Sequence, residues 1–130
     1  MSPESKSSAA ETGPLPAEAL YFKAVDSLAL GDLPAAIAGF RASLAADPAY
    51  TDAAHGLMHA LKDAGQLDEA ISMAQRLIAE HPDDVLAHTS LSILYQRSGR
   101  IAEAESAATR AKLLGWKMEL RQQTEAGSRT

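Results

Sequence analysis

Three short stretches recur along the chain at a fixed interval: Leu30-Gly31-Asp32-Leu33, Ala64-Gly65-Gln66-Leu67 and Ser98-Gly99-Arg100-Ile101. Their glycines are 34 residues apart, and each stretch follows an apolar segment with helical spacing. An alanine stands at the same offset after each glycine, at Ala36, Ala70 and Ala104. Agreement at several offsets indicates an internal repeat.

Prolines follow the same repeat. Pro48 and Pro82 are also 34 residues apart, and the next equivalent position holds Trp116. Because proline lacks an amide donor and clashes with the preceding turn, each proline ends one helix and separates it from the next. Each repeat is therefore predicted to be helix, glycine turn, helix, proline turn. We expect helices at about 17–30, 34–46, 51–64, 68–80, 84–98 and 101–114.

A helix-turn-helix unit of this length, with small residues at the helix crossing and proline between units, resembles the tetratricopeptide-repeat (TPR) family. The resemblance covers about 17–114 and implies an all-α fold: three TPR units in a right-handed superhelical array plus a C-terminal capping helix. The family's small residue at the crossing corresponds to Ala24, Met58 and Ser92, of which Met58 departs from the pattern. Lys23 also departs from the pattern, because Leu57 and Leu91 stand at the equivalent positions of the other units. This departure implies a slightly loosened first repeat.

The predicted organisation consists of a disordered N-terminal tail at 1–16, TPR 1 at 17–50, TPR 2 at 51–84, TPR 3 at 85–115, a capping helix at 116–124 and a flexible tail at 125–130. The first tail carries few large apolar groups and cannot bury enough surface to become ordered. Gly115 is expected to end the last repeat helix, so that Trp116 starts a short amphipathic seventh helix. This segment is placed to cover the last apolar face of the array.

The composition limits the classes of function. The 130 residues include 46% hydrophobic and 5% aromatic residues and no cysteine. This suits one packed helical domain and excludes disulfides, thiolate metal sites and a cysteine nucleophile. The N-terminus has no signal-peptide pattern, and no apolar run approaches the roughly 20 residues that span a bilayer. We therefore expect an unprocessed cytoplasmic protein without a membrane span.

The net charge of -5 is unevenly distributed. Up to Gln96 there are 13 acidic and 5 basic residues, whereas from Arg97 onward there are 4 acidic and 7 basic residues. The C-terminal part is thus a basic pole on an acidic body. No interleaved aromatic residues or binding motif accompany its cations, so a nucleic-acid partner is disfavoured.

In TPR proteins the first helix of each unit lines a concave groove that binds extended peptides or helices, and the resemblance implies a protein-binding scaffold or adaptor here. The corresponding groove residues are Glu18, Tyr21, Val25, Leu28, Asp52, His55, His59, Lys62, Leu86, Thr89, Ile93 and Arg97. Their apolar members are expected to receive apolar side chains of a partner. The alternative is that the N-terminal tail or a second copy covers them.

A well-known groove in this family clamps the C-terminal carboxylate of a chaperone tail with Lys, Asn and Arg side chains. The matching positions here hold Tyr21, Val25, Gly56, Leu86 and Ser90. None of these residues supplies a cation or an amide donor to a carboxylate pair. We therefore expect no chaperone-tail recognition through such a clamp.

Metal and catalytic sites are not expected. His55 and His59 lie one helical turn apart and share a face, but zinc needs four ligands and no motif completes the set. The sequence contains no Gly-rich phosphate loop, nucleophile elbow or metalloprotease motif. Carboxylates gather at predicted helix starts, where the helix dipole explains them. We expect no enzyme activity, no metal and no cofactor.

The C-terminal end offers a second binding surface. Trp116, Met118 and Leu120 adjoin the basic pole and are candidates for docking onto a larger multi-protein complex or for forming a homo-oligomer. The alternative is that Trp116 and Leu120 cap the array within one chain. In both binding hypotheses the partner is another protein chain.

Overall fold

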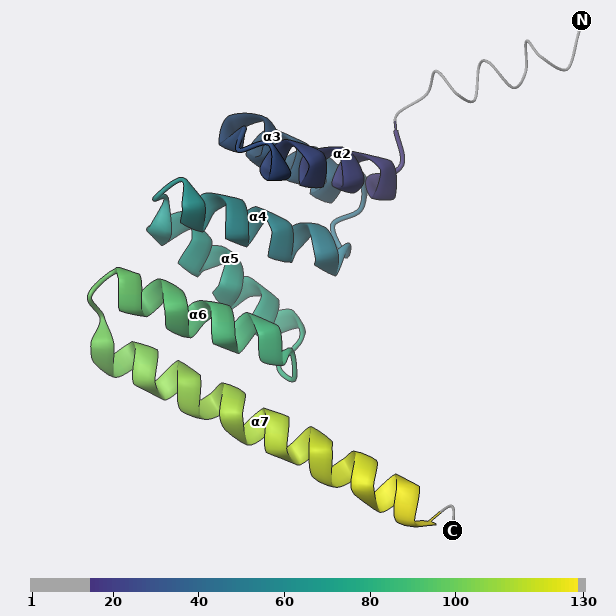
Figure 1. Ribbon diagram of the computed structural model, residues 1–130, viewed down its shortest axis with the longest axis vertical. Helices are drawn as coiled ribbons and strands as arrows, with labels where there is room; N and C mark the ends of the chain where they lie inside the picture. Colours follow the sequence, from purple (N-terminus) through teal and green to yellow (C-terminus); the bar gives the residue numbers. More distant parts are fainter. Residues whose placement is uncertain (1–14, 129–130) are drawn as a thin grey trace, which may run out of the picture. The chain divides into compact units, whose positions relative to one another are not determined.

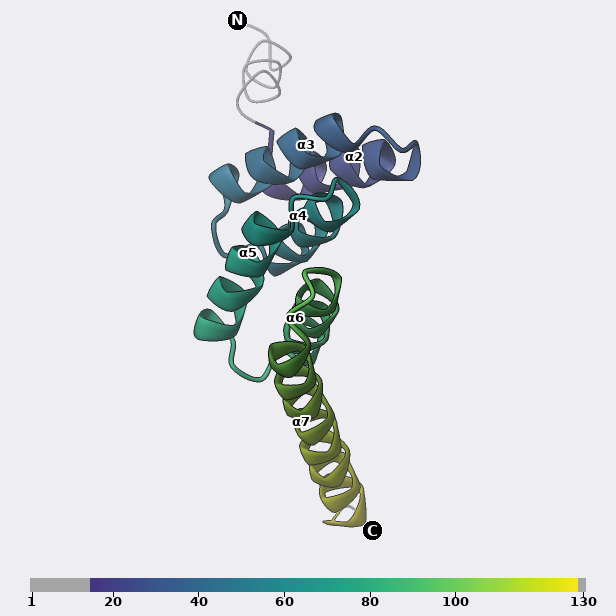
Figure 2. The same ribbon diagram turned by 90° about the vertical axis from the view of Figure 1, so that its left-hand side faces the viewer.

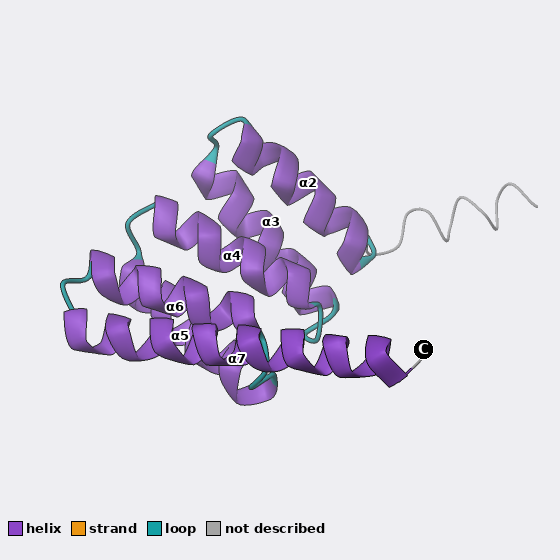
Figure 3. Cartoon of the chain, turned by 60° about the horizontal axis from the view of Figure 1, so that its bottom comes forward, coloured by secondary structure: helices purple, strands orange, loops and turns teal. Residues whose placement is uncertain are grey.

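The computed structural model describes residues 15–128, and all regular secondary structure in this range is helical (Figure 3). The helices are α2 (Ala17–Ala29), α3 (Leu33–Ala46), α4 (Thr51–Asp63), α5 (Leu67–Glu80), α6 (Val85–Arg97) and α7 (Ile101–Ser128). The all-α repeat fold is thereby confirmed, and every helix begins within one residue of its predicted start. The tail predicted at 1–16 lies outside the described residues except for its last two. No helix in the described range is both long and apolar enough to cross a bilayer.

The chain divides into two compact units at Gly65. Unit 1 contains α2, α3 and α4, and unit 2 contains α5, α6 and α7 (Figures 1 and 2). Within unit 1, α2 packs on α3 and α3 on α4; within unit 2, α5 packs on α6 and α6 on α7. Each unit therefore combines one complete helical hairpin with one further helix.

The three repeated glycines form the turns between consecutive helices, α2 and α3, α4 and α5, and α6 and α7. Gly31, Gly65 and Gly99 have φ angles of 78°, 78° and 79°, in the left-handed region that side chains with a Cβ rarely adopt. The amide of Gly31 donates to the Leu28 carbonyl at 3.0 Å, and the other two glycines make the equivalent bond. Glycine is required here because the chain must end one helix and reverse within two or three residues.

Close helix packing builds the core of unit 1. A Cβ added to Gly39 of α3 would lie 2.7 Å from the Cβ of Ala24, so α2 and α3 cross where both residues are small. The ring of Phe40 is fully buried and occupies the space that a side chain on Gly56 of α4 would need. The buried Ser43 hydroxyl donates to the Ala17 carbonyl at 2.7 Å, which joins the end of α3 to the start of α2. This repeat is tightly packed.

Unit 2 joins its helices through buried polar groups as well as apolar contacts. The ring nitrogen Nε2 of His88 donates to the Pro82 carbonyl at 2.9 Å. The Tyr95 hydroxyl accepts a bond from Gln75 of α5 at 2.9 Å, and Ser92 of α6 donates to the Ala104 carbonyl of α7 at 2.8 Å. These bonds give the polar groups hydrogen-bond partners. Without partners, polar groups in the interior would lower the stability of the fold.

Two details of the local structure depend on single residues. Asp84 caps α6, where its carboxylate accepts a hydrogen bond from the Ala87 amide at 3.1 Å. Lys23 does not reflect a loosened repeat. Its equivalents Leu57 and Leu91 are buried, whereas Lys23 is exposed because no helix precedes α2 in the described chain to cover this side.

The separate capping helix is also absent, because α7 continues through Gly115 to Ser128. Helices α3 and α5 end just before Pro48 and Pro82, but Trp116 at the equivalent position keeps its amide and does not clash with the preceding turn. Glycine within a helix costs only about 1 kcal/mol relative to alanine, which a helix that is already formed tolerates. Residues 125–128 of the predicted flexible tail are accordingly helical, and 129–130 lie outside the described residues.

Candidate functional site

The residues predicted to line a groove fall into two groups, one in each unit. Those in unit 1 lie on α2 and α4: Glu18, Tyr21, Val25, Leu28, Asp52, His55, His59 and Lys62. Those in unit 2 lie on α6: Leu86, Thr89, Ile93 and Arg97. Each group occupies the first helices of the repeats, as expected, and each is described within its own unit.

The α6 group forms an open apolar stripe. Leu86 and Ile93 are two helical turns apart on one face, and their side chains are 58% and 37% exposed. Thr89 lies between them, and its hydroxyl donates to the Val85 carbonyl at 3.0 Å, which leaves its methyl group for contact. Arg97 is exposed at the end of the same stripe. We call Leu86, Thr89, Ile93 and Arg97 the α6 stripe.

The α2 group is arranged differently, because Tyr21 already contacts three aromatic rings. Its ring centroid lies 5.8 Å from that of the buried Phe40, 5.4 Å from that of Tyr50 in a stacked arrangement, and 5.3 Å from that of Phe22 in an edge-to-face arrangement. These distances are typical of stabilising aromatic pairs. Tyr21 therefore supports the fold of unit 1, and Phe22, which is 56% exposed, presents the open ring of this cluster.

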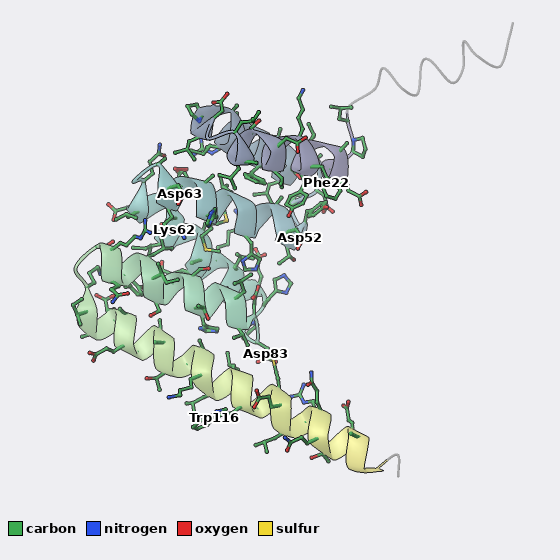
Figure 4. All side chains as sticks on the ribbon, viewed as in Figure 1. Phe22, Asp52, Lys62, Asp63, Asp83 and Trp116 are labelled. Atoms are coloured by element: carbon green, nitrogen blue, oxygen red, sulfur yellow. The ribbon has the colours of Figure 1, made fainter. Side chains whose placement is uncertain are left out.

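Carboxylates surround the ring cluster. Partial burial raises the pKa of Tyr50, and the negative charges of Glu18, Asp52 and Asp47 raise it further. Phe22 and Asp52 lie at the same end of α2 and α4 in Figure 4. We define the acidic aromatic patch by its aromatic residues Tyr21, Phe22 and Tyr50 and by its acidic residues Glu18, Asp47 and Asp52. Sequence reasoning identified three of its members, Glu18, Tyr21 and Asp52, but did not connect them with the others.

The two histidines of α4 do not converge with further ligands. Nε2 of His59 lies 3.4 Å from Oδ2 of Asp63, one turn farther along the helix. Within residues 15–128, no three His, Asp or Glu side chains are arranged to hold a metal ion.

A pocket in unit 2 escaped the sequence analysis. It has a volume of about 350 Å³ and is lined by Ile78, His88, Leu91, Tyr95, Glu103, Ser106, Ala107 and Arg110. At its edge, Nε of Arg100 donates to Glu103 at 2.7 Å, and the Arg100 guanidinium lies 4.7 Å from the Tyr95 ring centroid. The lining comes from three helices, so no local spacing in the sequence pointed to it.

The C-terminal residues predicted to dock lie on the free part of α7. Trp116, Met118 and Leu120 are 55%, 43% and 63% exposed, and α7 runs past the end of α6 in Figure 1. Trp116 lies on the side of α7 away from α6 (Figure 4). The Lys112 ammonium lies 5.8 Å from the Trp116 ring centroid, within the range of a cation–π contact. The capping role considered for Trp116 and Leu120 is thus not seen within this unit.

Comparisons with known proteins agree with the repeat. A family model described as tetratricopeptide repeat matches residues 27–94 and 63–113. Two crystal structures of MamA match with TM-scores of 0.76 and 0.75, each at 25% identity, and cover 80% and 81% of this chain. The chain spans about three fifths of their length, 61% and 57% respectively.

A third solved structure, the type III secretion translocator chaperone SycD of Yersinia enterocolitica, matches with a TM-score of 0.73 at 24% identity, and the alignment covers 86% of each chain. At that identity the likeness concerns the fold. No curated protein sequence matches the chain. The family model spans well over half of the residues, and its repeats coincide with the glycine turns described above. The chain belongs to the tetratricopeptide repeat family.

Proposed function

We propose that this protein is an adaptor that binds a peptide or helix of a partner protein along the first helices of its repeats, and that it is not an enzyme. The family is one of protein–protein interaction scaffolds. The observation that carries the more specific proposal is the α6 stripe, where Leu86 and Ile93 point outward two turns apart. Apolar side chains at this spacing suit a partner helix or extended segment that places its own apolar residues at matching intervals.

The energetics favour the α6 stripe over Tyr21 as the apolar anchor. Tyr21 already has ring neighbours, so a partner gains little by covering it further. Leu86 and Ile93 retain exposed apolar area, and burying each would contribute on the order of 1 kcal/mol. Arg97 at the end of the stripe would favour a partner with a carboxylate at that end.

The test uses the double variant Leu86→Glu/Ile93→Glu. Captured partners are identified with the wild-type protein, and the affinity of the shortest binding segment is then measured by calorimetry. We expect at least a tenfold loss of affinity in the variant, because two charges would face the apolar side chains of the partner. The matched control is Ile101→Glu, which replaces an exposed isoleucine of the same unit outside the stripe.

Two results would overturn the groove proposal. One is full affinity in the double variant. The other is an equal loss of affinity in Ile101→Glu. Thermal unfolding of all three proteins checks that the exposed substitutions leave the fold intact.

The proposal includes no carboxylate clamp. The positions that would form it carry Tyr21, Val25, Gly56, Leu86 and Ser90, and none of them is a cation that could bind a terminal carboxylate. An acidic C-terminal peptide and its amidated form should therefore bind equally weakly in fluorescence anisotropy. A clear preference for the free carboxylate would show that a clamp exists.

A second candidate role is docking through the C-terminal end of α7. It is favoured by one observation: Trp116 and Leu120 remain more than half exposed on the part of α7 that extends past the end of α6. Large apolar residues gathered on an unpaired segment commonly mark a contact surface. Trp116→Ala should weaken such a contact without lowering the unfolding temperature, because the ring does not contribute to the core.

A further inference from the structure

The free end of α7 has a defined chemical character. We call residues 110–121 the helix end. Leu113, Trp116 and Leu120 follow one another at i, i+3 and i+7 and form a single exposed stripe. Lys112 and Lys117 flank this stripe on its two sides, and Arg110 and Arg121 add positive charge. Glu119 is the only acidic residue of the segment, so the helix end is apolar in its centre and strongly basic around it.

This charge pattern opposes pairing between two helix ends. An antiparallel pair centred on Trp116 would bring Arg110 of one copy near Arg121 of the other and would bring the two Lys117 side chains together, whereas only Lys112 would find an opposite charge, at Glu119. Like charges in such register are destabilising. A suitable partner surface should instead be negative and carry its own exposed aromatic or apolar centre.

The acidic aromatic patch of unit 1 has this character. Phe22 is its exposed centre, and Glu18 and Asp52 stand in the first turns of α2 and α4 beside the ring cluster. Burial raises the pKa of Tyr50, and the negative charge concentrated there raises it further. Cations can pair with these carboxylates and can also contact the ring faces.

We infer that the helix end of one copy docks on the acidic aromatic patch of a second copy. The inference builds on the proposed docking role of α7 and specifies the surface that receives it. Trp116 and Leu120 supply the apolar contact with Phe22, and Lys117 and Arg121 supply charges complementary to Glu18 and Asp52. The two surfaces differ, so the contact is heterologous: a reciprocal exchange closes a dimer, and a one-way contact builds a chain.

The small size of the two surfaces sets the expected strength. A few helical turns against one patch bury less than the roughly 800 Å² per partner of a standard stable interface. The association should therefore be weak, with a dissociation constant in the micromolar range or above. It should also depend on salt, because the range of exposed charges falls from about 10 Å at 0.1 M ionic strength to about 3 Å at 1 M.

The experiment is sedimentation equilibrium of the full chain at low and at high salt. We expect the average mass to exceed that of the monomer at low salt and to fall toward it at high salt. Two charge reversals follow: the patch variant Glu18→Lys/Asp52→Lys and the end variant Lys117→Glu/Arg121→Glu. Each alone should weaken association at least tenfold, and mixing the two should restore it, because each variant complements a surface of the other.

Control variants separate this contact from general charge effects. Asp63→Lys reverses an exposed charge at the end of α4 opposite to Asp52 (Figure 4), outside the acidic aromatic patch, and should associate like the wild type. Should the lysines of the patch variant lower the unfolding temperature through the helix dipoles, Glu18→Gln/Asp52→Asn removes the charge without reversal and must still weaken association. Leu86→Glu/Ile93→Glu should leave self-association unchanged. Failure of the groove proposal can therefore be distinguished from failure of this inference.

Three results would overturn the inference: a monomeric wild type at low salt and the highest soluble concentration, unchanged association in both charge variants, or a mixture of the two variants that fails to associate. A monomeric wild type whose end variant loses a different protein partner would leave the docking role standing. That result would still show that the helix end does not bind a second copy of this chain.

Discussion

Helices α5 and α7 begin at the same repeat position but differ in length and surroundings. Ala70 and Ala104 are equivalent and both buried. One residue later, Ile71 is buried in α5, whereas its equivalent Glu105 is exposed in α7. Helix α7 buries a single face, formed by Ala104, Ala107 and Ala111, whereas α5 buries Ile71 in addition to Ala70. The repeat pattern specifies a helix, but its place in the array determines which of its faces are apolar.

The ends of the two helices extend this contrast. Helix α5 stops at Glu80, ahead of Pro82, and α7 passes the equivalent Trp116 by three turns. Helices α3 and α5 thus end ahead of a proline, and α7, which has Trp116 at that repeat position, continues. The following substitutions test both parts of the comparison, beginning with the largest effect.

The largest difference is expected between Ala74→Asp in α5 and Ala108→Asp at the equivalent position of α7. Ala74 is fully buried and Ala108 is exposed. An unpaired charge at position 74 should lower the free energy of unfolding by about 3–5 kcal/mol. The same change at position 108 should cost less than about 1 kcal/mol, mostly from helix propensity. Urea unfolding followed by circular dichroism measures both, and similar losses would contradict the one-sided burial of α7.

A proline at the repeat position should shorten α7. Trp116→Pro removes an amide donor and clashes with the preceding turn, at a cost of about 3 kcal/mol within the helix. The helix should avoid this cost by ending near Gly115. The circular dichroism signal of the residues beyond Gly115 should then be lost, while the core of unit 2 stays folded. Trp116→Ala is the control and should keep the full helical signal. An unchanged far-ultraviolet spectrum for Trp116→Pro would show that proline does not set the length of these helices.

Smaller and opposite effects are expected at two glycines of unit 2. Gly115 lies within α7, and a Cβ there would meet open space, so Gly115→Ala should stabilise the helix by about 0.5–1 kcal/mol. Gly99 has a φ of 79°, and Gly99→Ala should destabilise the turn by about 1 kcal/mol. Thermal unfolding of the pair measures both signs. Stabilisation by Gly99→Ala would contradict the left-handed turn.

The smallest effect concerns pH at the other end of the array. The pKa of Tyr50 is raised above its usual value of 10.0 by burial and by nearby carboxylates. Its contribution to stability is therefore fully present below pH 10 and is lost as pH rises through the higher folded-state pKa. Tyr50→Phe should remove the part of the decrease in unfolding free energy at alkaline pH that comes from ionisation of Tyr50. An identical pH dependence of unfolding in the wild type and the variant would refute the role of the patch charges.

The repeat and its turns could be predicted because they depend on local chemistry. Glycine alone takes the left-handed turn readily, and proline cannot continue a helix, so Gly31, Gly65 and Gly99 with Pro48 and Pro82 marked most helix ends. Gly115 was misinterpreted because glycine was treated as a helix breaker equal to proline. Its helical cost is a fraction of proline's, and the absence of proline at position 116 was the stronger signal.

The sites were less predictable, because they depend on which surfaces other helices cover. Lys23 suggested weak packing, but its exposure shows only that no described residue covers that side of α2. Tyr21 was predicted as a groove anchor, but its role depends on Phe40 and Tyr50, which come from other segments of unit 1. Spacing along one helix is enough to place Leu86 with Ile93 on one face of α6, and the binding role of that face stays a prediction.

The continuous α7 helix also links binding to folding. An isolated helix as short as the segment after Trp116 is only marginally formed in water, so its order is propagated from the turns that Ala104, Ala107 and Ala111 hold in place. A molecule bound at the helix end recognises a shape that exists only while the α6–α7 hairpin is folded. By linkage, its binding must raise the free energy of unfolding of unit 2 by RT ln(1 + [L]/Kd). Occupancy of the helix end should consequently slow amide hydrogen exchange in α6, a helix that the bound molecule need not touch.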